Sequence, residues 1–308
     1  MNKLTLVLLT LMLAACHDLR RADSKATAHA TVAAPAAIGE FDNHEQVWRA
    51  REANAGAVAP PHVNVAIEAT SQSDWSLWRI RMDASPAVEA TWAIRTVRQA
   101  DGALVMTPYR SLVATPAPAV AFDAQQWTPL DACALRGAPR AAADIAACIA
   151  IAPGIGASAA LLPLAIERDG EWLRIRLYAD QARGADARED ARRVMSFGGW
   201  AAVNGAGPKA AADSGDWHMD RTVRIGSEGG RYTLKWRDGS ASGYSLGLER
   251  LTYRDGNVPV LKLSVIDDAN GSALAYAWAN PEATRIGINL GWVQVGLDRE
   301  GIAPASTK

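Results

Sequence analysis

The chain has 308 residues, with 32 lysines and arginines against 33 aspartates and glutamates, and 49% of its residues are hydrophobic. This balance lacks the basic surplus of nucleic-acid-binding proteins, so we expect no nucleic-acid partner. The hydrophobic share is ordinary for a globular protein and excludes wholesale disorder. Eleven Trp against three Phe indicate many flat contact surfaces with a polar edge.

The first sixteen residues have the pattern of a secretion signal. A short basic start at residues 1–3 precedes an unbroken apolar run at residues 4–13. This run is shorter than the about twenty residues that a membrane-spanning helix needs and is typical of a signal peptide. The sequence Leu-Ala-Ala-Cys at residues 13–16 resembles the bacterial lipobox, in which the Cys is lipidated. We therefore expect a signal peptide over residues 1–15 and an acyl anchor on Cys16 that binds the lipid membrane.

The residue after Cys16 indicates which membrane receives the anchor. It is His17, and not the Asp that typically retains such lipoproteins in the inner membrane. By analogy we expect the outer membrane, with the folded part facing the periplasm. The alternative is an ordinary signal peptide that a Cys follows by chance.

Cys133 and Cys148 are left as an even pair once Cys16 is lipidated. In an oxidising compartment such a pair predicts a disulfide, which closes a loop of about 15 residues and stabilises the fold by roughly 3 kcal/mol in the chain-entropy model. Two free buried thiols and half of a metal site are the alternatives. None of the five His is near the pair in sequence, which disfavours a metal site, and we expect no metal and no cofactor.

Changes in composition divide the mature chain. Residues 16–38 are the lipidated Cys and an Ala-, Thr- and Pro-rich tether that we expect to be disordered. Residues 205–216 are small, polar and turn-rich, and they predict a boundary between a first domain at 39–208 and a second domain at 216–300. We expect a short disordered tail at 301–308.

Most of the chain between residues 39 and 300 has the patterns of antiparallel strands. Residues 41–53 predict one helix, capped by Asp42 or Asn43. Elsewhere apolar and polar residues alternate, which predicts strands with one buried face; examples are residues 78–82, 172–177 and 232–237. Asp-Gly and Asn-Gly pairs predict five tight hairpins, at residues 101–102, 169–170, 238–239, 255–256 and 270–271. The chain is therefore predicted to be mainly β and antiparallel.

The first domain resembles the CpcT/CpeT-type chromophore lyase family in the order and spacing of several short motifs. Residues 39–46 (Gly-Glu-Phe-Asp-Asn-His-Glu-Gln) match the family's opening helix. Arg95 matches an Arg of its Pro-Tyr-Arg-Gln-Arg motif, with Trp92 in place of the Tyr. Its other matches are two spaced cysteines at Cys133 and Cys148, Arg-Gly-x-Asp at residues 183–186, and a closing Gly-Pro-aromatic strand near residues 198–200. The resemblance covers a little over half of the chain and leaves residues 216–300 unexplained.

The family fold is a calycin (lipocalin-like) antiparallel barrel, and its members attach linear tetrapyrroles to cysteines of light-harvesting proteins. The resemblance therefore implies a calycin-like barrel that holds a hydrophobic or tetrapyrrole-like molecule. It implies that Arg95 and Arg183 pair with propionates and that Asp186 contacts pyrrole nitrogens. Trp92 and Trp200 would line a flat hydrophobic pocket. The alternatives are outer-face positions for the Arg side chains, a turn position for the Asp, and core packing for the Trp side chains.

Three weaker signs of chemistry are set aside. Residues 243–247 (Gly-Tyr-Ser-Leu-Gly) fit the nucleophile elbow of hydrolases, but a hairpin signal follows in place of a helix, and no His comes after His218. Residues 267–271 lack the alternating ligands of a calcium loop and predict a plain hairpin turn. His44 and His62 have no visible partner, so we expect surface or core positions for both.

Two functions from different classes follow. The first is an envelope lipoprotein whose barrel binds a hydrophobic or bilin-like small molecule, with lyase chemistry as the family's activity. Secretion separates the chain from the cytosolic proteins that accept the tetrapyrrole in the lyase reaction, and no catalytic constellation is visible. The sequence therefore leaves both an enzyme and a non-enzyme open. The second is a non-enzymatic structural or interaction lipoprotein whose C-terminal β domain docks onto an envelope protein. A ligand binder needs an open lumen, whereas a structural module has a filled barrel and an exposed apolar patch.

Overall fold

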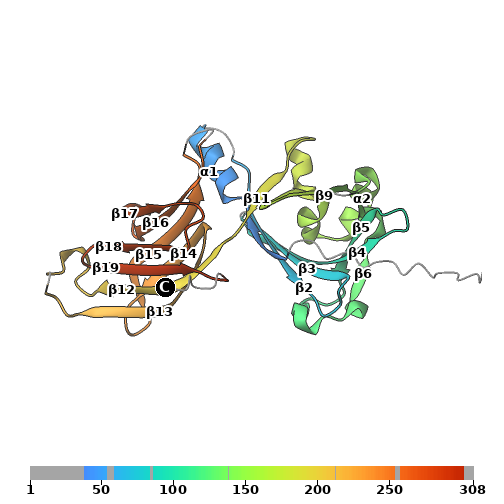
Figure 1. Cartoon of the computed structure of the whole chain (residues 1–308). Helices are drawn as coiled ribbons and strands as arrows, with labels where there is room; N and C mark the ends of the chain where they lie inside the picture. Colours follow the sequence, from blue (N-terminus) through green and yellow to red (C-terminus); the bar gives the residue numbers. More distant parts are fainter. Residues whose placement is uncertain are drawn as a thin grey trace, which may run out of the picture.

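The computed structural model describes residues 38–53, 59–83, 86–137, 139–211, 213–253 and 257–301. The predicted signal peptide, Cys16 and nearly all of the predicted tether and tail lie outside these residues. Two β units lie side by side, and helix α1 (His44–Ala53) lies at their junction (Figure 1). In the described part of the chain, no helix has both the length and the apolar character that crossing a bilayer requires.

The first unit is a closed antiparallel barrel. Its ring has the order β4-β3-β2-β1-β11-β10-β9-β8-β7-β5 and closes where β5 pairs with β4, while β6 extends the ladder on β5. Closure pairs the end strands, which an open sheet would leave with free backbone groups. The strands are β1 (Gly39–Asp42), β2 (His62–Ala69), β3 (Trp75–Asp83), β4 (Val88–Arg98), β5 (Leu104–Ser111), β6 (Trp127–Pro129), β7 (Leu135–Arg136), β8 (Arg140–Ala142), β9 (Pro163–Asp169), β10 (Trp172–Leu177) and β11 (Glu189–Arg193).

The alternation seen in the sequence forms the barrel wall. In β3, Trp78, Ile80 and Met82 point into the buried core, while Arg79 and Arg81 are exposed. Strand β10 follows the same pattern. Because successive side chains of a strand point to opposite faces, each strand contributes every second residue to the interior.

Helical turns accompany the barrel and were not predicted. They are α2 (Ile145–Ile151), η1 (Ala119–Ala121), η2 (Ala124–Gln126), η3 (Asp131–Cys133), η4 (Ala152–Gly154), η5 (Ala157–Leu161) and η6 (Tyr178–Arg183). The predicted disulfide is confirmed, because Cys133 of η3 is bonded to Cys148 of α2, with Cα atoms 4.6 Å apart. The disulfide ties α2 to the turn η3, which lies between β6 and β7.

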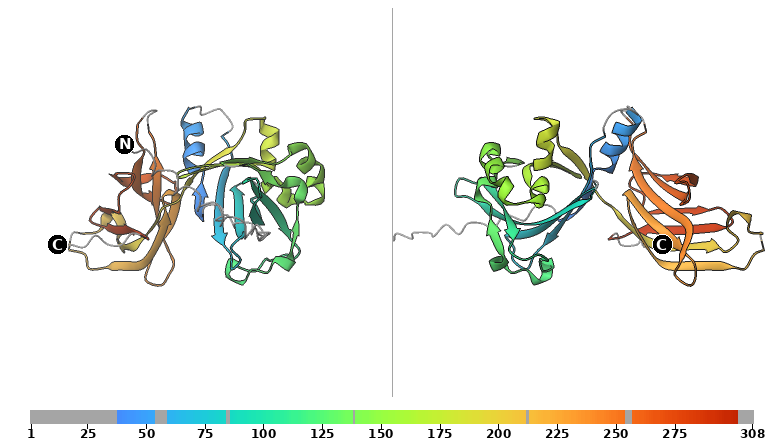
Figure 2. Two further views of the ribbon diagram at one scale, coloured as in Figure 1. Left: turned by 45° about the vertical axis from the view of Figure 1, so that its right-hand side comes forward. Right: turned by 180° about the vertical axis from the view of Figure 1, so that it is seen from behind.

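The second unit is a sandwich of two four-stranded antiparallel sheets, seen from two further directions in Figure 2. One sheet has the order β13-β12-β19-β18 and the other β14-β15-β16-β17. Side chains of both sheets, such as Phe197 and Leu263, share one buried cluster, as expected for sheets packed face to face. The elements are β12 (Ser196–Asn204), η7 (Gly207–Lys209), β13 (Trp217–Gly226), β14 (Glu228–Lys235), β15 (Ala241–Leu251), β16 (Val260–Asp267), β17 (Ala273–Ala279), β18 (Arg285–Asn289) and β19 (Val293–Arg299).

The predicted fold class is confirmed: the protein is mainly β, with a closed antiparallel barrel followed by a smaller antiparallel unit. Four of the five predicted hairpin turns join consecutive strands, at residues 101–102, 169–170, 238–239 and 270–271. The fifth, at residues 255–256, lies outside the described residues.

Two predicted boundaries differ from the structure. The helix begins at His44 and not at residue 41, because Phe41 belongs to β1, where it is fully buried between β2 and β11. The chain passes from barrel to sandwich at residues 194–195, before the predicted boundary at 205–216. Residues 198–200 belong to β12, which pairs with β13 and β19 and not with the barrel. The turn-rich residues 205–216 connect β12 to β13, so their composition marks a loop inside the sandwich.

Candidate functional site

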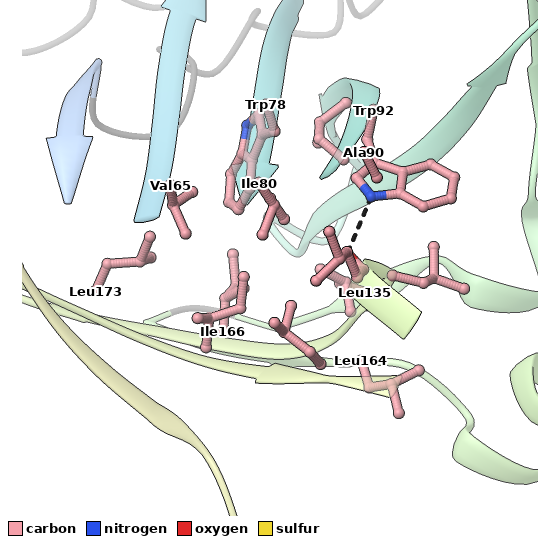
Figure 3. Close-up of a cluster of buried hydrophobic side chains, with 14 of the residues drawn as sticks. Val65, Trp78, Ile80, Ala90, Trp92, Leu135, Leu164, Ile166 and Leu173 are labelled. Atoms are coloured by element: carbon pink, nitrogen blue, oxygen red, sulfur yellow. Dashed lines mark hydrogen bonds between the residues drawn. The ribbon is translucent and has the colours of Figure 1, made fainter. Parts of the chain in front are cut away.

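The barrel interior is a packed hydrophobic core. Trp78, Ile80 and Trp92 from one wall meet Leu164 and Leu173 from the other, and all five are at most 1% exposed (Figure 3). The density of such a core leaves few voids larger than a water molecule. The interior therefore has the character of a filled barrel.

Trp92 is part of this core and is also tied to the barrel's helical cover. Its indole Nε1 donates a hydrogen bond of 3.0 Å to the carbonyl oxygen of Leu161, in the η5 turn. The dashed line in Figure 3 marks this bond. Because the one polar atom of the ring is satisfied by the backbone, Trp92 acts in the structure as a core side chain.

Arg95 lies on the outer wall of the barrel, three residues beyond Trp92 on β4. Its Nε donates to Asp74 Oδ2 over 2.9 Å, and its guanidinium lies 5.7 Å from the ring centre of Trp75. Trp75 belongs to a small hydrophobic cluster outside the barrel. Strand alternation thus separates Arg95 from Trp92, and the two side chains do not share a pocket.

Arg183 is held by two carboxylates near the start of β11. Its Nη1 donates to Asp180 Oδ1 over 3.0 Å and also to Glu189 Oε1. Glu189 is fully buried and accepts a 2.6 Å bond from Asn43 Nδ2. Burial raises the pKa of Glu189 to about 7, against the opposing effect of the guanidinium. Arg183 is therefore committed to an internal ion pair.

The two remaining predicted ligand residues lie elsewhere. Asp186 is on an exposed loop beside a surface cleft of about 280 Å³. Trp200 belongs to β12 of the sandwich and is 36% exposed. The structure thus does not bring Trp92, Arg95, Arg183, Asp186 and Trp200 together, and their ligand-binding roles stay predictions.

The junction between the two units contains a buried network of charged side chains. Arg192 of β11 pairs through Nη1 with Glu45 Oε2 and through Nη2 with Glu228 Oε2, both over 2.8 Å. Arg250 of β15 pairs with the other oxygen of Glu228 over 2.8 Å and donates to the carbonyl oxygen of Arg193 over 2.9 Å. Glu228 thus lies between one guanidinium from each unit. Removing any one of these side chains would leave a charged partner buried without full compensation.

Two surface clefts flank this junction. The first, of about 610 Å³, is lined by polar and charged side chains, by a Val and two Pro, and by Trp172, whose ring lies 5.4 Å from the Arg192 guanidinium. The second, of about 880 Å³, contains His62. His62 bonds Asp42 through Nε2 over 2.7 Å and Asp83 through Nδ1 over 2.8 Å. These two carboxylates raise its pKa to about 9, with Asp42 the larger cause.

The sandwich and α1 together carry a continuous row of aromatic rings, here named the aromatic stripe: Trp48, Tyr253, Trp278 and Tyr276. The ring centres of neighbours in this order are 5.2, 5.1 and 5.8 Å apart. Tyr253, Trp278 and Tyr276 are 40%, 52% and 59% exposed. Lys262 lies with its Nζ 5.8 Å from the Tyr276 ring. Exposed aromatic groups that touch one another form a patch of the kind that marks an interaction site.

The aromatic stripe was missed in the sequence because its rings come from three separate segments. Trp48 is on α1, Tyr253 follows β15, and the other two rings are on β17. One local signal was available, since residues 273–279 (Ala-Leu-Ala-Tyr-Ala-Trp-Ala) alternate small and large residues without a charge. Small residues inward and large apolar residues outward are the reverse of an ordinary solvated strand.

The motifs set aside in the sequence are structural. Ser245 of the Gly-x-Ser-x-Gly motif is buried inside strand β15, where its Oγ donates to Asp268 Oδ2 over 2.9 Å. Residues 267–271 form the turn between β16 and β17, as predicted. Among the residues that the structure describes, no three His, Cys, Asp or Glu side chains are grouped as metal ligands are.

No protein-family model matches the chain, and neither a curated protein nor a solved structure matches it. The resemblance to the chromophore lyase family therefore stays a prediction.

Proposed function

We propose that this chain is a lipid-anchored protein of the bacterial outer membrane, facing the periplasm, that acts as a non-enzymatic interaction protein. In this proposal the barrel is a packed scaffold and the aromatic stripe is the surface that docks an envelope protein. The observation that carries it is the contrast between the two units. The described aromatic side chains of the barrel unit are buried or half-buried, whereas three of the four stripe rings are at least 40% exposed.

A protein is the partner that this surface fits best. Tyr and Trp are enriched at the energetic centres of protein interfaces, because each buries a large area at a small cost in side-chain entropy. The hydroxyl of Tyr and the indole N–H of Trp keep such a surface soluble before it is covered. The aromatic stripe has this composition, and Lys262 and Glu249 form a charged rim beside it.

Localisation in the envelope rests on the N-terminal sequence and is supported by the disulfide. The lipobox-like residues 13–16 supply the anchor at Cys16. A disulfide between Cys133 and Cys148 requires an oxidising compartment to persist. Metabolic labelling with a radioactive fatty acid tests the anchor: the chain should incorporate label, and the Cys16→Ala variant should not. Equal labelling of both would remove lipidation from the proposal.

The other candidate, a hydrophobic or tetrapyrrole-like ligand inside a lyase-like barrel, requires the core side chains to move apart. A closed antiparallel barrel is compatible with the family resemblance, but fold alone does not carry the family's activity. A fluorescence titration with biliverdin and with a fatty acid separates the candidates. We expect no saturable quenching of Trp emission. Saturable quenching at micromolar ligand that is lost in Trp92→Phe would instead establish a ligand-binding barrel.

The docking surface is tested directly by a photo-crosslinking amino acid placed at Tyr253, in the middle of the aromatic stripe. In living cells this position should give a discrete crosslinked product that contains a second, different envelope protein and whose mass is not twice that of the chain. The same group at Val120, which is 85% exposed on the barrel unit, is the matched control and should give none. Products from both positions, or from neither, would contradict docking through the aromatic stripe.

A further inference from the structure

The edge strand β17 differs from the other edge strands of the sandwich. The two sheets end at β13 and β18 and at β14 and β17. Charged side chains occur in β13, β14 and β18, including Arg224, Arg231 and Arg285. β17 has seven residues, no charge and no Pro, and it has one bulge, at Leu274, so that residues 275–279 form its regular edge. Monomeric proteins protect their sheet edges with charges, Pro, bulges or covering segments. An uncharged edge of this length is expected to be covered in the working protein.

In the described part of the chain, β16 is the only strand that pairs with β17. The backbone groups on the other side of β17 are therefore free to accept a further strand. Leu274, Tyr276 and Trp278 alternate along it and are 44%, 59% and 52% exposed. The edge thus offers both a free ladder and a row of apolar side chains, which are the two components of recognition by strand addition.

We propose that β17 pairs with β17 of a second copy of this chain, antiparallel and about a two-fold axis at Tyr276. The two β14-β15-β16-β17 sheets then join into one sheet that continues across the axis. Both members of such an interface contribute the same surface, as in most homodimers.

The sequence of β17 is self-complementary about Tyr276. Antiparallel pairing around this residue places Ala275 opposite Ala277 of the partner in the regular part of the strand, and it brings Leu274, which lies at the bulge, next to Trp278 of the partner. Each large side chain thus faces a large apolar one on the outer surface, and each Ala faces an Ala on the inner surface. Cross-strand pairs of aromatic and aliphatic side chains stabilise sheets. No charge is desolvated, because the strand has none.

Pairing of the two β17 strands also extends the aromatic stripe. Tyr276 and Trp278 are its end nearest the edge, so the two-fold axis brings two stripes together into one longer surface. This step rests on the proposed function, because it makes the docking surface a property of the dimer. The alternative to a second copy is an extended segment of a different protein that pairs with the same edge. The experiments below distinguish these two occupants.

The first experiment uses residues 17–308, which contain all the described elements and their pairings and lack Cys16. With Cys133 and Cys148 bonded to each other, a Tyr276→Cys variant has a single free thiol. Residues directly opposite in an antiparallel pair have Cα atoms about 4.5–5.5 Å apart, which a disulfide can span. We expect air oxidation to give a covalent dimer that reductant separates. Val120→Cys is the matched control and should stay monomeric.

The second experiment measures mass in solution by light scattering at micromolar concentrations. The unaltered protein should have twice the chain mass. Tyr276→Lys and Tyr276→Glu should each raise the dissociation constant of the dimer by about ten-fold or more, because like charges meet at the axis and a central aromatic contact is lost. An equal mixture of the two variants should restore dimers, since the opposite charges then face each other.

A monomeric mass together with no Tyr276→Cys crosslink would overturn the dimer and leave the edge to an extended partner segment. So would a dimer that both charged variants leave intact, because its interface would lie elsewhere. The proposed function fails on a different measurement, the loss of a specific crosslink from Tyr253. The two failures are therefore distinguishable.

Discussion

At the residue scale, the position of one side chain separates the two functions that the sequence left open. Trp92 was predicted to line a ligand pocket, and the structure places it 1% exposed in the barrel core, with its indole N–H bonded to Leu161. A side chain that lines an open lumen keeps a free face, and a side chain of a packed core does not. The stability of variants at this position therefore reports on the state of the lumen.

We predict that Trp92→Ala lowers the free energy of unfolding by about 3–5 kcal/mol, as large-to-small substitutions of core aromatic residues do. Urea denaturation of residues 17–308 measures this loss. Trp278→Ala, which truncates a ring that is 52% exposed, is the control and should cost much less. A loss below about 1 kcal/mol at Trp92 would indicate an open lumen and favour a ligand-binding barrel.

His62 is predicted to make stability depend on pH. Its folded-state pKa of about 9 lies above its ordinary value of 6.5, because both ring nitrogens face carboxylates. Its stabilising contribution is thus present in full below pH 6.5 and is lost as the pH rises through 9. The free energy of unfolding should fall over this range in the unaltered protein and fall less in His62→Gln.

Asp83→Asn is the matched variant for this measurement, because it removes one of the two acceptors and leaves Asp42. Its loss of stability between pH 6.5 and 9 should lie between those of the unaltered protein and His62→Gln. Identical pH profiles for all three proteins would contradict the assignment of a charged His62 at the junction.

At the element scale, the disulfide and the segment around it form the part of the barrel that depends least on strand pairing. Cys148 lies on α2, in an Ala-rich run between β8 and β9, and Cys133 is in a short 3-10 turn. Replacing both with Ala should lower the free energy of unfolding by about 3 kcal/mol, the value for closing a loop of this length. Thermal denaturation with and without reductant measures it, and reductant should affect only the unaltered protein.

Elements whose signals are local were predictable from the sequence. The alternation of apolar and polar residues predicted the strand around Trp78. Asp-Gly and Asn-Gly pairs predicted four hairpins that the structure contains. The helix α2 was missed, because its Ala-rich sequence has little periodicity and packing onto the barrel end decides its conformation. Phe41 was placed in a helix for a related reason. Its pairing partners, Arg193 and Val65, are far away in the chain.

The candidate site was less predictable than the fold. The aromatic stripe joins Trp48, Tyr253 and Trp278 from three elements, and their adjacency depends on how α1 meets the sandwich. The predicted pair of Trp92 and Arg95 failed to share a pocket by simple strand geometry, since positions three apart point to opposite faces. Alternation in β4 was sufficient to foresee that separation.

At the scale of the whole molecule, the relation between barrel and sandwich depends on the buried charges at the junction. Arg192 is 3% exposed and joins Glu45 of α1 to Glu228 of β14. Replacing a buried ion pair entirely by apolar residues is often neutral, whereas removing one partner leaves a buried charge without compensation. In such a variant Glu228 keeps Arg250, whereas Glu45 keeps the half-exposed Arg49 and a hydrogen bond from the Thr252 N–H.

We therefore predict that Arg192→Met lowers the free energy of unfolding by about 3–5 kcal/mol and uncouples the two units. Because Arg192 makes charged links at this junction in which both partners are buried, the unaltered protein should unfold in one transition followed by both fluorescence and circular dichroism, and the variant should show two. Arg188→Met, which removes an exposed guanidinium paired with Asp190, is the control and should change stability by less than about 1 kcal/mol. A single transition in Arg192→Met with unchanged stability would mean that apolar contacts hold the two units together. The barrel would then stay attached to the sheet of the dimer and move with it as one body.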